Sequence, residues 1–350
     1  MRVLIIKTSA LGDIVHALPV LDYLHHLTPG VEIDWVVESS FREILEGNPL
    51  ISRIHLVHTK KWRKNTFSLQ TWREVSRLRA ELCSRNYDLA FDIQGNVKSG
   101  LITWVSGCKR RYGFDRDAVR EAPNLYFTTN HVPLRKTDHH VTDRSLRVIS
   151  IPFGKDYSGT QLSADIQTNS EDDAVAEVFL ATMSDGLVFL FHNGTTWKTK
   201  LWYEKGWIEL GISLLASYPD ASILLSWGSE EEFKIAERIA SGIGQKARVL
   251  PRLSIKGFTA IIKKVDLMVG GDTGPIHIAA AVGTPTVSFY RATDGKRNGP
   301  RGEMHRIIQS NLYCCRCLNK QCDKDQFCRE SIHPESLLKA IDQLLAGPEL

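Results

Sequence analysis

The sequence predicts an α/β protein made of two doubly wound, Rossmann-like domains. Strand-like and helix-like segments alternate along all 350 residues, which is the pattern of βα units. Several strand segments, such as RVLII at 2–6 and GLVFLFH at 186–192, are almost wholly apolar, as in parallel strands covered by helices on both faces. The length also suffices for two domains of ordinary size.

Ten segments have the composition of strands, five in each half of the chain. In the first half they are residues 2–6, 31–37, 53–58, 87–93 and 109–114. In the second half they are residues 186–192, 221–227, 247–251, 266–271 and 285–290. Helical periodicity predicts helices over 14–27, 71–84, 96–106, 138–149, 203–217, 230–240, 255–263, 274–282 and 334–345.

A polar stretch without a clear period, residues 153–173, is expected to link the two domains. We therefore expect a first domain over 1–160, a second domain over 161–330 and a C-terminal helix within 331–350. Two such domains in tandem would face each other with the carboxyl ends of their sheets, where ligands of open α/β sheets bind.

Positive charge is concentrated in the first half of the chain. Residues 1–150 contain 22 Lys and Arg against 16 Asp and Glu, whereas residues 151–350 contain 22 against 24. Either the first half meets an acidic partner (nucleic acid, an anionic lipid surface or a phosphorylated substrate) or it is simply a basic surface. Near the basic runs only Trp62 and Tyr112 offer rings for base stacking, so a nucleic-acid partner is not expected.

The chain is expected to remain in a reducing cytosol, because it has no run of about 18 apolar residues and no secretory signal. Five of its seven cysteines lie between Cys314 and Cys328. Such clustering favours metal over disulfides in a cytosolic protein. Cys314 and Cys317 form a single C-x2-C pair, however, so a reduced, partly buried loop is the expectation and structural zinc the alternative.

Two turns of the second half have the residues of a phosphate site. Asp272, Thr273, Gly274 and His277 follow a predicted strand and open a helix, whose free N–H groups would point at an anion. The alternative is that Asp272 or Thr273 merely caps that helix. Lys200, in the turn after the strand at 186–192, could neutralise a diphosphate without magnesium, or could be a solvated lysine.

A third turn, SWGSEEE, places carboxylates after the strand at 221–227. Carboxylates at this edge of a sheet commonly accept ribose hydroxyls. They could equally complement the dipole of the helix that they open.

The first half offers a carboxylate and two basic runs. Asp13 lies at the first strand-to-helix turn, where it could cap a helix or act as a general base. The runs HTKKWRK (58–64) and KRRYGFDR (109–116), with Arg111, Arg116 and Arg120, could bind phosphates or carboxylates, or form a solvated basic face. The run around Trp62 also fits an anionic membrane surface.

These motifs resemble those of the ADP-heptose:lipopolysaccharide heptosyltransferases, glycosyltransferase family 9. The resemblance is carried, over nearly the whole chain, by KTSALGDIVHALP, FDIQGNVKSG, GTTWKTKLW, WGSEEE and GGDTGPIHIAAAVGTPTVSFY. KKWRK and DAVREA favour the heptosyltransferase I branch, which adds the first heptose. The turn before Lys200 is one residue longer than in the form compared, and the cysteine-rich stretch occurs in only some relatives.

The resemblance implies a two-domain GT-B enzyme with inverting chemistry, no cofactor and no metal. It implies Asp13 as the general base and Lys200 on the leaving diphosphate. The implied donor-binding residues are Thr195, Thr196, Lys200, Glu232 (or Glu231, one residue away), Asp272, Thr273, Gly274 and His277. The implied acceptor-binding residues are Lys60, Arg63, Lys64 and Arg120.

The implied function is transfer of L-glycero-D-manno-heptose from ADP-heptose to the Kdo region of a lipid A precursor. The enzyme would then be cytoplasmic and peripheral on the cytoplasmic face of the inner membrane. Two alternatives stay open. One is heptosyltransferase II or a relative with another acceptor, and the other is a sugar-nucleotide-binding module without turnover.

Overall fold

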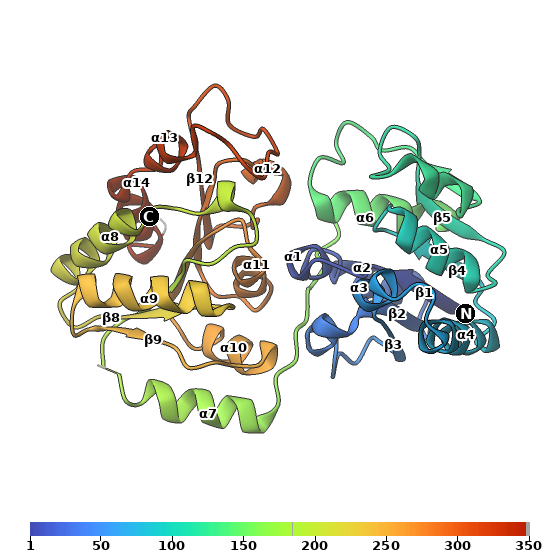
Figure 1. Ribbon diagram of the computed structural model, residues 1–350, viewed down its shortest axis with the longest axis horizontal. Coiled ribbons are helices and arrows are strands. Elements are labelled where there is room, and N and C mark those ends of the chain that lie inside the picture. The colour runs from blue at the N-terminus through green and yellow to red at the C-terminus, as the bar shows by residue number, and fades with distance from the viewer. Residues whose placement is uncertain (184, 348–350) are drawn as a thin grey trace. The chain divides into compact units, whose positions relative to one another are not determined.

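The computed structural model describes residues 1–183 and 185–347. The chain divides into two compact units, Met1–Gln167 and Thr168–Leu350 (Figure 1), where the sequence placed the boundary at 160. In the described residues each unit contains a six-stranded sheet whose paired strands are all parallel. The predicted α/β class with two doubly wound units is therefore confirmed. No helix within the described ranges is both long and apolar enough to cross a membrane.

The sheet of the first unit has the strand order β3-β2-β1-β4-β5-β6. Its strands are β1 (Arg2–Ile6), β2 (Glu32–Glu38), β3 (Arg53–Val57), β4 (Leu89–Asp92), β5 (Arg111–Phe114) and β6 (Asn130–Val132). Its helices are α1 (Leu11–Val15), α2 (Pro19–Leu27), η1 (Ser39–Ile44), α3 (Thr59–Lys64), α4 (Leu69–Ser84), α5 (Val97–Val105), η2 (Ala122–Tyr126), α6 (Val141–Ser150) and η3 (Ile151–Phe153).

The sheet of the second unit has the order β12-β11-β10-β7-β8-β9. Its strands are β7 (Val188–His192), β8 (Ser222–Ser226), β9 (Ala247–Val249), β10 (Leu267–Gly271), β11 (Thr286–Tyr290) and β12 (His305–Gln309). Its helices are α7 (Ser170–Leu180), η4 (Lys198–Lys200), α8 (Glu204–Ser217), α9 (Glu230–Ile243), α10 (Ile255–Ile262), α11 (Gly274–Ala281), α12 (Gly295–Asn298), α13 (Asp325–Glu330) and α14 (Pro334–Leu345).

Helices pack on the faces of both sheets. In the first unit α4 packs against α5, burying Leu78 and Ile102 with the sheet, and α2 packs against α6. In the second unit α8 packs against α9 and α14 around Trp207, while α10 packs against α7 and α11. Figure 1 shows α7 running beside α10. Burial of these apolar faces, worth about 25 cal/mol per Å², stabilises each unit.

The strand orders place a switch point in the middle of each sheet. In the first unit the order reverses between β1 and β4, and in the second between β7 and β10. Chains that leave neighbouring strands in opposite directions open a crevice at the carboxyl ends, which is where ligands of such sheets bind. The turns after β1, β4, β7 and β10 are therefore the first places to look for a site.

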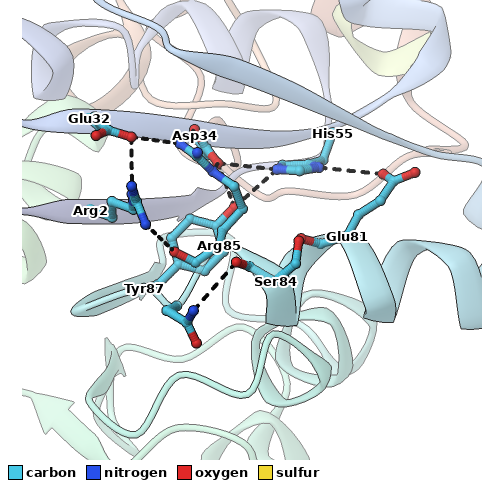
Figure 2. Close-up of polar contacts among 9 residues, drawn as sticks. Arg2, Glu32, Asp34, His55, Glu81, Ser84, Arg85 and Tyr87 are labelled. Carbon is cyan, nitrogen blue, oxygen red and sulfur yellow. Dashed lines mark hydrogen bonds and ion pairs between the residues drawn. The ribbon is translucent and has the colours of Figure 1, made fainter.

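A buried polar network ties β2, β3 and the start of β4 together (Figure 2). The Asp34 carboxylate accepts hydrogen bonds from Arg85 Nε at 2.7 Å and from the Tyr87 hydroxyl at 2.6 Å, and lies 3.3 Å from His55 Nε2. Arg85 also donates to Glu32 at 3.0 Å. Glu32 pairs with Arg2 at the beginnings of β2 and β1. The network thus extends to the amino ends of the strands, away from the ligand-binding edge, and its role is structural.

Candidate active site

Two predicted donor residues meet at the switch point of the second unit. β7 and β10 are adjacent and parallel, so the turns that follow them lie side by side. Lys200, in the turn after β7, places Nζ 2.7 Å from the Asp272 carboxylate and 3.2 Å from the Asp272 carbonyl oxygen. Lys200 and Asp272 are 72 positions apart in the sequence, and the side chains of this ion pair are only 16% and 5% exposed.

Asp272 is the centre of this cluster. Besides Lys200, its carboxylate contacts His277 Nε2 at 3.1 Å and accepts a hydrogen bond from Asn298 Nδ2 at 3.3 Å. Burial alone would raise the pKa of Asp272. The hydrogen bond with His277 and the charge of Lys200 outweigh burial, and the pKa is held well below its usual range. The carboxylate therefore stays ionised and holds Lys200 and His277 in place.

The start of α11 lies beside this cluster. Thr273 occupies the N-cap position, but its side chain makes no capping bond, and its hydroxyl donates to the Gly271 carbonyl at 3.3 Å. Gly274 is the first helical residue. Capping therefore does not explain the side chain of Thr273. The first N–H groups of α11 remain available to an anion.

The turn after β7 carries the two predicted hydroxyls. Thr195 is half-buried, and its hydroxyl accepts a hydrogen bond from the Trp197 N–H at 3.4 Å. Thr196 is exposed. Lys200 Nζ lies 4.8 Å from the centroid of the Trp197 ring, within the range of a cation–π contact.

The structure distinguishes the two candidate carboxylates at the start of α9. Glu232 accepts a hydrogen bond from the Gly228 N–H at 2.7 Å. A Cβ on Gly194 would lie 2.5 Å from this carboxyl group, so Glu232 rests on the backbone of the turn after β7. The Glu231 side chain is exposed and bonds no described residue. Glu232 is thus the carboxylate placed at the ends of β7 and β8.

Asp13 lies at the switch point of the first unit. It is the third residue of α1, half-buried, and its carboxylate accepts a hydrogen bond from the Ala10 N–H at 3.2 Å. The turn after β1 is tied to the turn after β4, because the Ser9 N–H donates to the Gln94 side chain at 3.3 Å. Asp13 therefore does help to cap α1, which leaves its second oxygen for other chemistry.

The cations of α3 that are predicted to bind the acceptor are exposed to solvent. Lys61 and Trp62 both donate to Glu74 of α4 at 2.7 Å, which fixes α3 against α4. The other three cations of α3, Lys60, Arg63 and Lys64, are exposed, and their side chains bond no described residue.

The cations around β5 divide differently. Arg120, in the loop after β5, is also exposed, and its side chain bonds no described residue. Arg111, by contrast, donates to the carbonyls of Phe127 and Cys108, so its guanidinium ties β5 to the neighbouring loops.

Comparisons with known proteins show the family of this chain. A family model described as glycosyltransferase family 9 (heptosyltransferase) matches residues 75–327. Lipopolysaccharide heptosyltransferase 1 of Pseudomonas aeruginosa is 33% identical over 100% of this chain and 99% of its own. The chain belongs to glycosyltransferase family 9. Its predicted membership of this family, and its predicted nature as a glycosyltransferase, are therefore confirmed.

Two solved heptosyltransferase structures match over 98% of this chain and 99% of their own, each at 29% identity. They are E. coli heptosyltransferase WaaC with ADP, with a TM-score of 0.79, and WaaC with ADP-2-deoxy-2-fluoro heptose, with a TM-score of 0.77. This family 9 chain therefore has the GT-B class expected from its motifs.

Two features of this family 9 chain were not anticipated from the sequence. Asn298 reaches Asp272 from α12, a short helix with no motif that could have marked it. Arg291 is buried beneath the turn that carries Lys200.

All seven cysteines are free thiols, and no group of three or more His, Cys, Asp or Glu among the described residues is placed to hold a metal ion.

Proposed function

We propose that this chain transfers L-glycero-D-manno-heptose from ADP-heptose to the Kdo region of a lipid A precursor, with inversion and without a metal, in building the lipopolysaccharide inner core. The observation that carries the proposal is the Lys200–Asp272–His277 cluster beside the start of α11. The names of the relatives, heptosyltransferases with ADP or an ADP-heptose analogue, support the choice of donor.

The donor's diphosphate is held by the second unit. Lys200 and the N–H groups of α11 supply positive charge where the leaving group gains negative charge. Thr195 and Thr196 donate hydroxyl hydrogen bonds, and Glu232 accepts from the ribose hydroxyls. Gly274 lets the phosphates approach the backbone, while Thr273, Asp272 and His277 bind the donor next to it. This arrangement stabilises departing ADP without a divalent cation.

Asp13 serves as the general base. As the anomeric carbon loses ADP, the attacking acceptor hydroxyl must lose a proton, and a carboxylate accepts it. Attack from the face opposite the departing phosphate inverts the anomeric configuration. One carboxylate oxygen of Asp13 accepts the Ala10 N–H, which leaves the other oxygen for this proton.

The acceptor is anionic and bound by the first unit. Lys60, Arg63, Lys64 and Arg120 pair with its carboxylates and phosphates. Beside α3, the side chains of Phe67, Leu69 and Trp72 are 96%, 76% and 63% exposed. Apolar side chains next to unpaired cations suit the surface of an anionic bilayer. This supports a peripheral protein on the cytoplasmic face of the inner membrane.

ADP release tests the proposal. The chain is incubated with ADP-heptose alone, then with Kdo-lipid A, and ADP is measured together with the mass of the acceptor. We expect ADP release that depends on the acceptor and a gain of one heptose on the lipid. Release only with an acceptor that already carries heptose would indicate the second-heptose enzyme. Binding of ADP-heptose without release under any of these conditions would indicate a module without turnover.

A further inference from the structure

The cysteine-rich segment, residues 313–329, packs directly on the turn that carries Lys200. The Thr199 hydroxyl donates to the Asn319 carbonyl at 2.5 Å. Arg329 donates to the Lys198 carbonyl at 3.4 Å. Both contacts join this segment to residues of the turn between 197 and 201. The segment therefore forms a wall of the proposed donor site.

A buried arginine locks this wall to the turn. Arg291 is 1% exposed, donates to the Leu201 carbonyl, and pairs with the Asp325 carboxylate at 2.5 Å. The same carboxylate pairs with Arg329 at 2.7 Å. Removing one partner of such a buried pair is costly, which explains why the segment keeps a defined position against the turn.

Two lysines approach one indole ring at this wall. Lys200 Nζ lies 4.8 Å, and Lys320 Nζ 5.2 Å, from the centroid of the Trp197 ring. The two ammonium groups are therefore no more than about 10 Å apart. Lys200 is neutralised by Asp272, whereas Lys320 is exposed and pairs with no carboxylate among the described residues.

The charges around the turn favour an anion. Among the described residues, the charged side chains that contact the turn or one another number four cations and three carboxylates. They are Lys200, Lys320, Arg291, Arg329, Asp272, Asp325 and Glu232. This local excess of positive charge lies in a half of the chain where acidic residues outnumber basic ones. Such an excess at a sheet's carboxyl edge attracts a polyanion.

We propose that Lys320, supplied by the cysteine-rich segment, is a second ammonium group for the diphosphate of the donor. The proposal rests on the donor site described under the proposed function. Lys200 acts from the turn after β7, with Asp272 holding it, and Lys320 acts from the wall, with Trp197 holding its ammonium group. The exposed ammonium has its full charge available for a phosphate oxygen.

Equilibrium binding of ADP and of adenosine tests this role. In Lys320→Ala we expect the Kd for ADP to rise about tenfold, as for a lost charged hydrogen bond. The Kd for adenosine, which lacks phosphates, should change less than about twofold. Lys320→Arg should recover most of the ADP affinity. The matched control is Lys324→Ala, because Lys324 is an exposed lysine of the same segment that contacts neither Trp197 nor the turn.

An unchanged Kd for ADP in Lys320→Ala would overturn the proposal. Equal losses for ADP and adenosine, or equal losses in the two lysine variants, would also overturn it and would leave Lys320 a structural residue. If the wild-type chain bound adenosine but gained nothing from the diphosphate, the donor site itself would be refuted, and this proposal with it.

Discussion

At the scale of single residues, the proposed donor site depends on how one lysine is held. Lys200 bonds both the side chain and the backbone of Asp272, and Asp272 is held in turn by His277 and Asn298. An ammonium group fixed in this way loses little conformational freedom when a phosphate arrives. The same contacts keep the carboxylate ionised, so it continues to orient Lys200 across the physiological pH range.

Substituting Lys200 by Ala should weaken ADP binding while leaving the fold intact. A charged hydrogen bond is typically worth about 1.5–3 kcal/mol, so the Kd for ADP should rise by roughly 10- to 150-fold. Calorimetric titration with ADP measures this. Lys205→Ala, at a lysine 82% exposed on α8, is the control and should bind normally. If both variants bound ADP like the wild type, Lys200 would lie outside the donor site.

Asp34 should contribute stability that is lost in acid. Burial would raise its pKa, but the hydrogen bonds from His55, Arg85 and Tyr87 outweigh burial and lower it to about 2. Because the folded pKa lies below the unfolded value of about 3.9, the stabilisation is present above pH 4 and disappears as the pH falls toward 2. It amounts to about 2 kcal/mol.

Denaturant unfolding of the wild type and of Asp34→Asn measures this contribution. The variant should be less stable at pH 7, and the gap should narrow as the pH falls from about 5 to about 3. A gap that stayed constant with pH would show that the charge of Asp34 contributes nothing to stability.

At the scale of elements, α3 separates cations with different roles. Glu74 binds Lys61 and Trp62, and these hydrogen bonds lower the pKa of Glu74 to about 2. The anchored face fixes the helix, so the opposite face presents Lys60, Arg63 and Lys64 to solvent without partners. A helix used only as a solvated surface would not need this division.

Converting Lys60, Arg63 and Lys64 together to Ala should raise the KM for the lipid acceptor and reduce its salt dependence, because unpaired surface cations act through screened attraction. The Kd for ADP-heptose should not change. Initial rates against Kdo-lipid A at several salt concentrations test this. Lys61→Ala, which removes an exposed cation of the same helix that is paired with Glu74, should have a smaller effect. Equal changes in acceptor and donor constants would refute the assignment of α3 to the acceptor.

The sequence predicts most of the strands and helices of this chain, but not all of them. All ten predicted strands form, and most of them are buried apolar runs. β6 and β12 were missed because Asn130–Val132 is only three residues long and His305–Gln309 is mostly polar, so neither gives a clear apolar run. The predicted helix 14–27 is divided into α1 and α2 at Pro19, and α7 begins inside the expected linker. The contact of Asn298 with Asp272 could not be predicted from the sequence, because only the tertiary fold brings the two residues together.

At the scale of the whole molecule, the proposed mechanism stabilises the leaving group with protein groups rather than with a metal. The chain has two Asp-x-Asp pairs, at 115–117 and 323–325. Asp325 is occupied by Arg291 and Arg329, and Asp115 accepts from the Ala118 N–H at 3.1 Å. Lys200 and the start of α11 already place positive charge in the proposed donor site.

Heptose transfer should therefore survive EDTA. The rate is measured after chelation, with and without added Mg²⁺ or Mn²⁺. A strict requirement for either ion would contradict the account. A loss of activity that only added zinc restores would implicate the cysteine-rich segment. The rate of Cys317→Ser, measured in the same way, would then show whether the thiols of that segment are responsible.

In the proposed mechanism, the first unit supplies the base and the second unit holds the donor. Asp13→Asn tests it most directly, because Asn retains the oxygen that accepts the Ala10 N–H and caps as well as Asp. The variant should be as stable as the wild type and bind ADP-heptose with an unchanged Kd. Its kcat with Kdo-lipid A should fall by about 10²–10⁴, the usual contribution of a general base. A folded Asp13→Asn chain that binds donor and turns over at the wild-type rate would contradict the claim and leave Asp13 a helix cap.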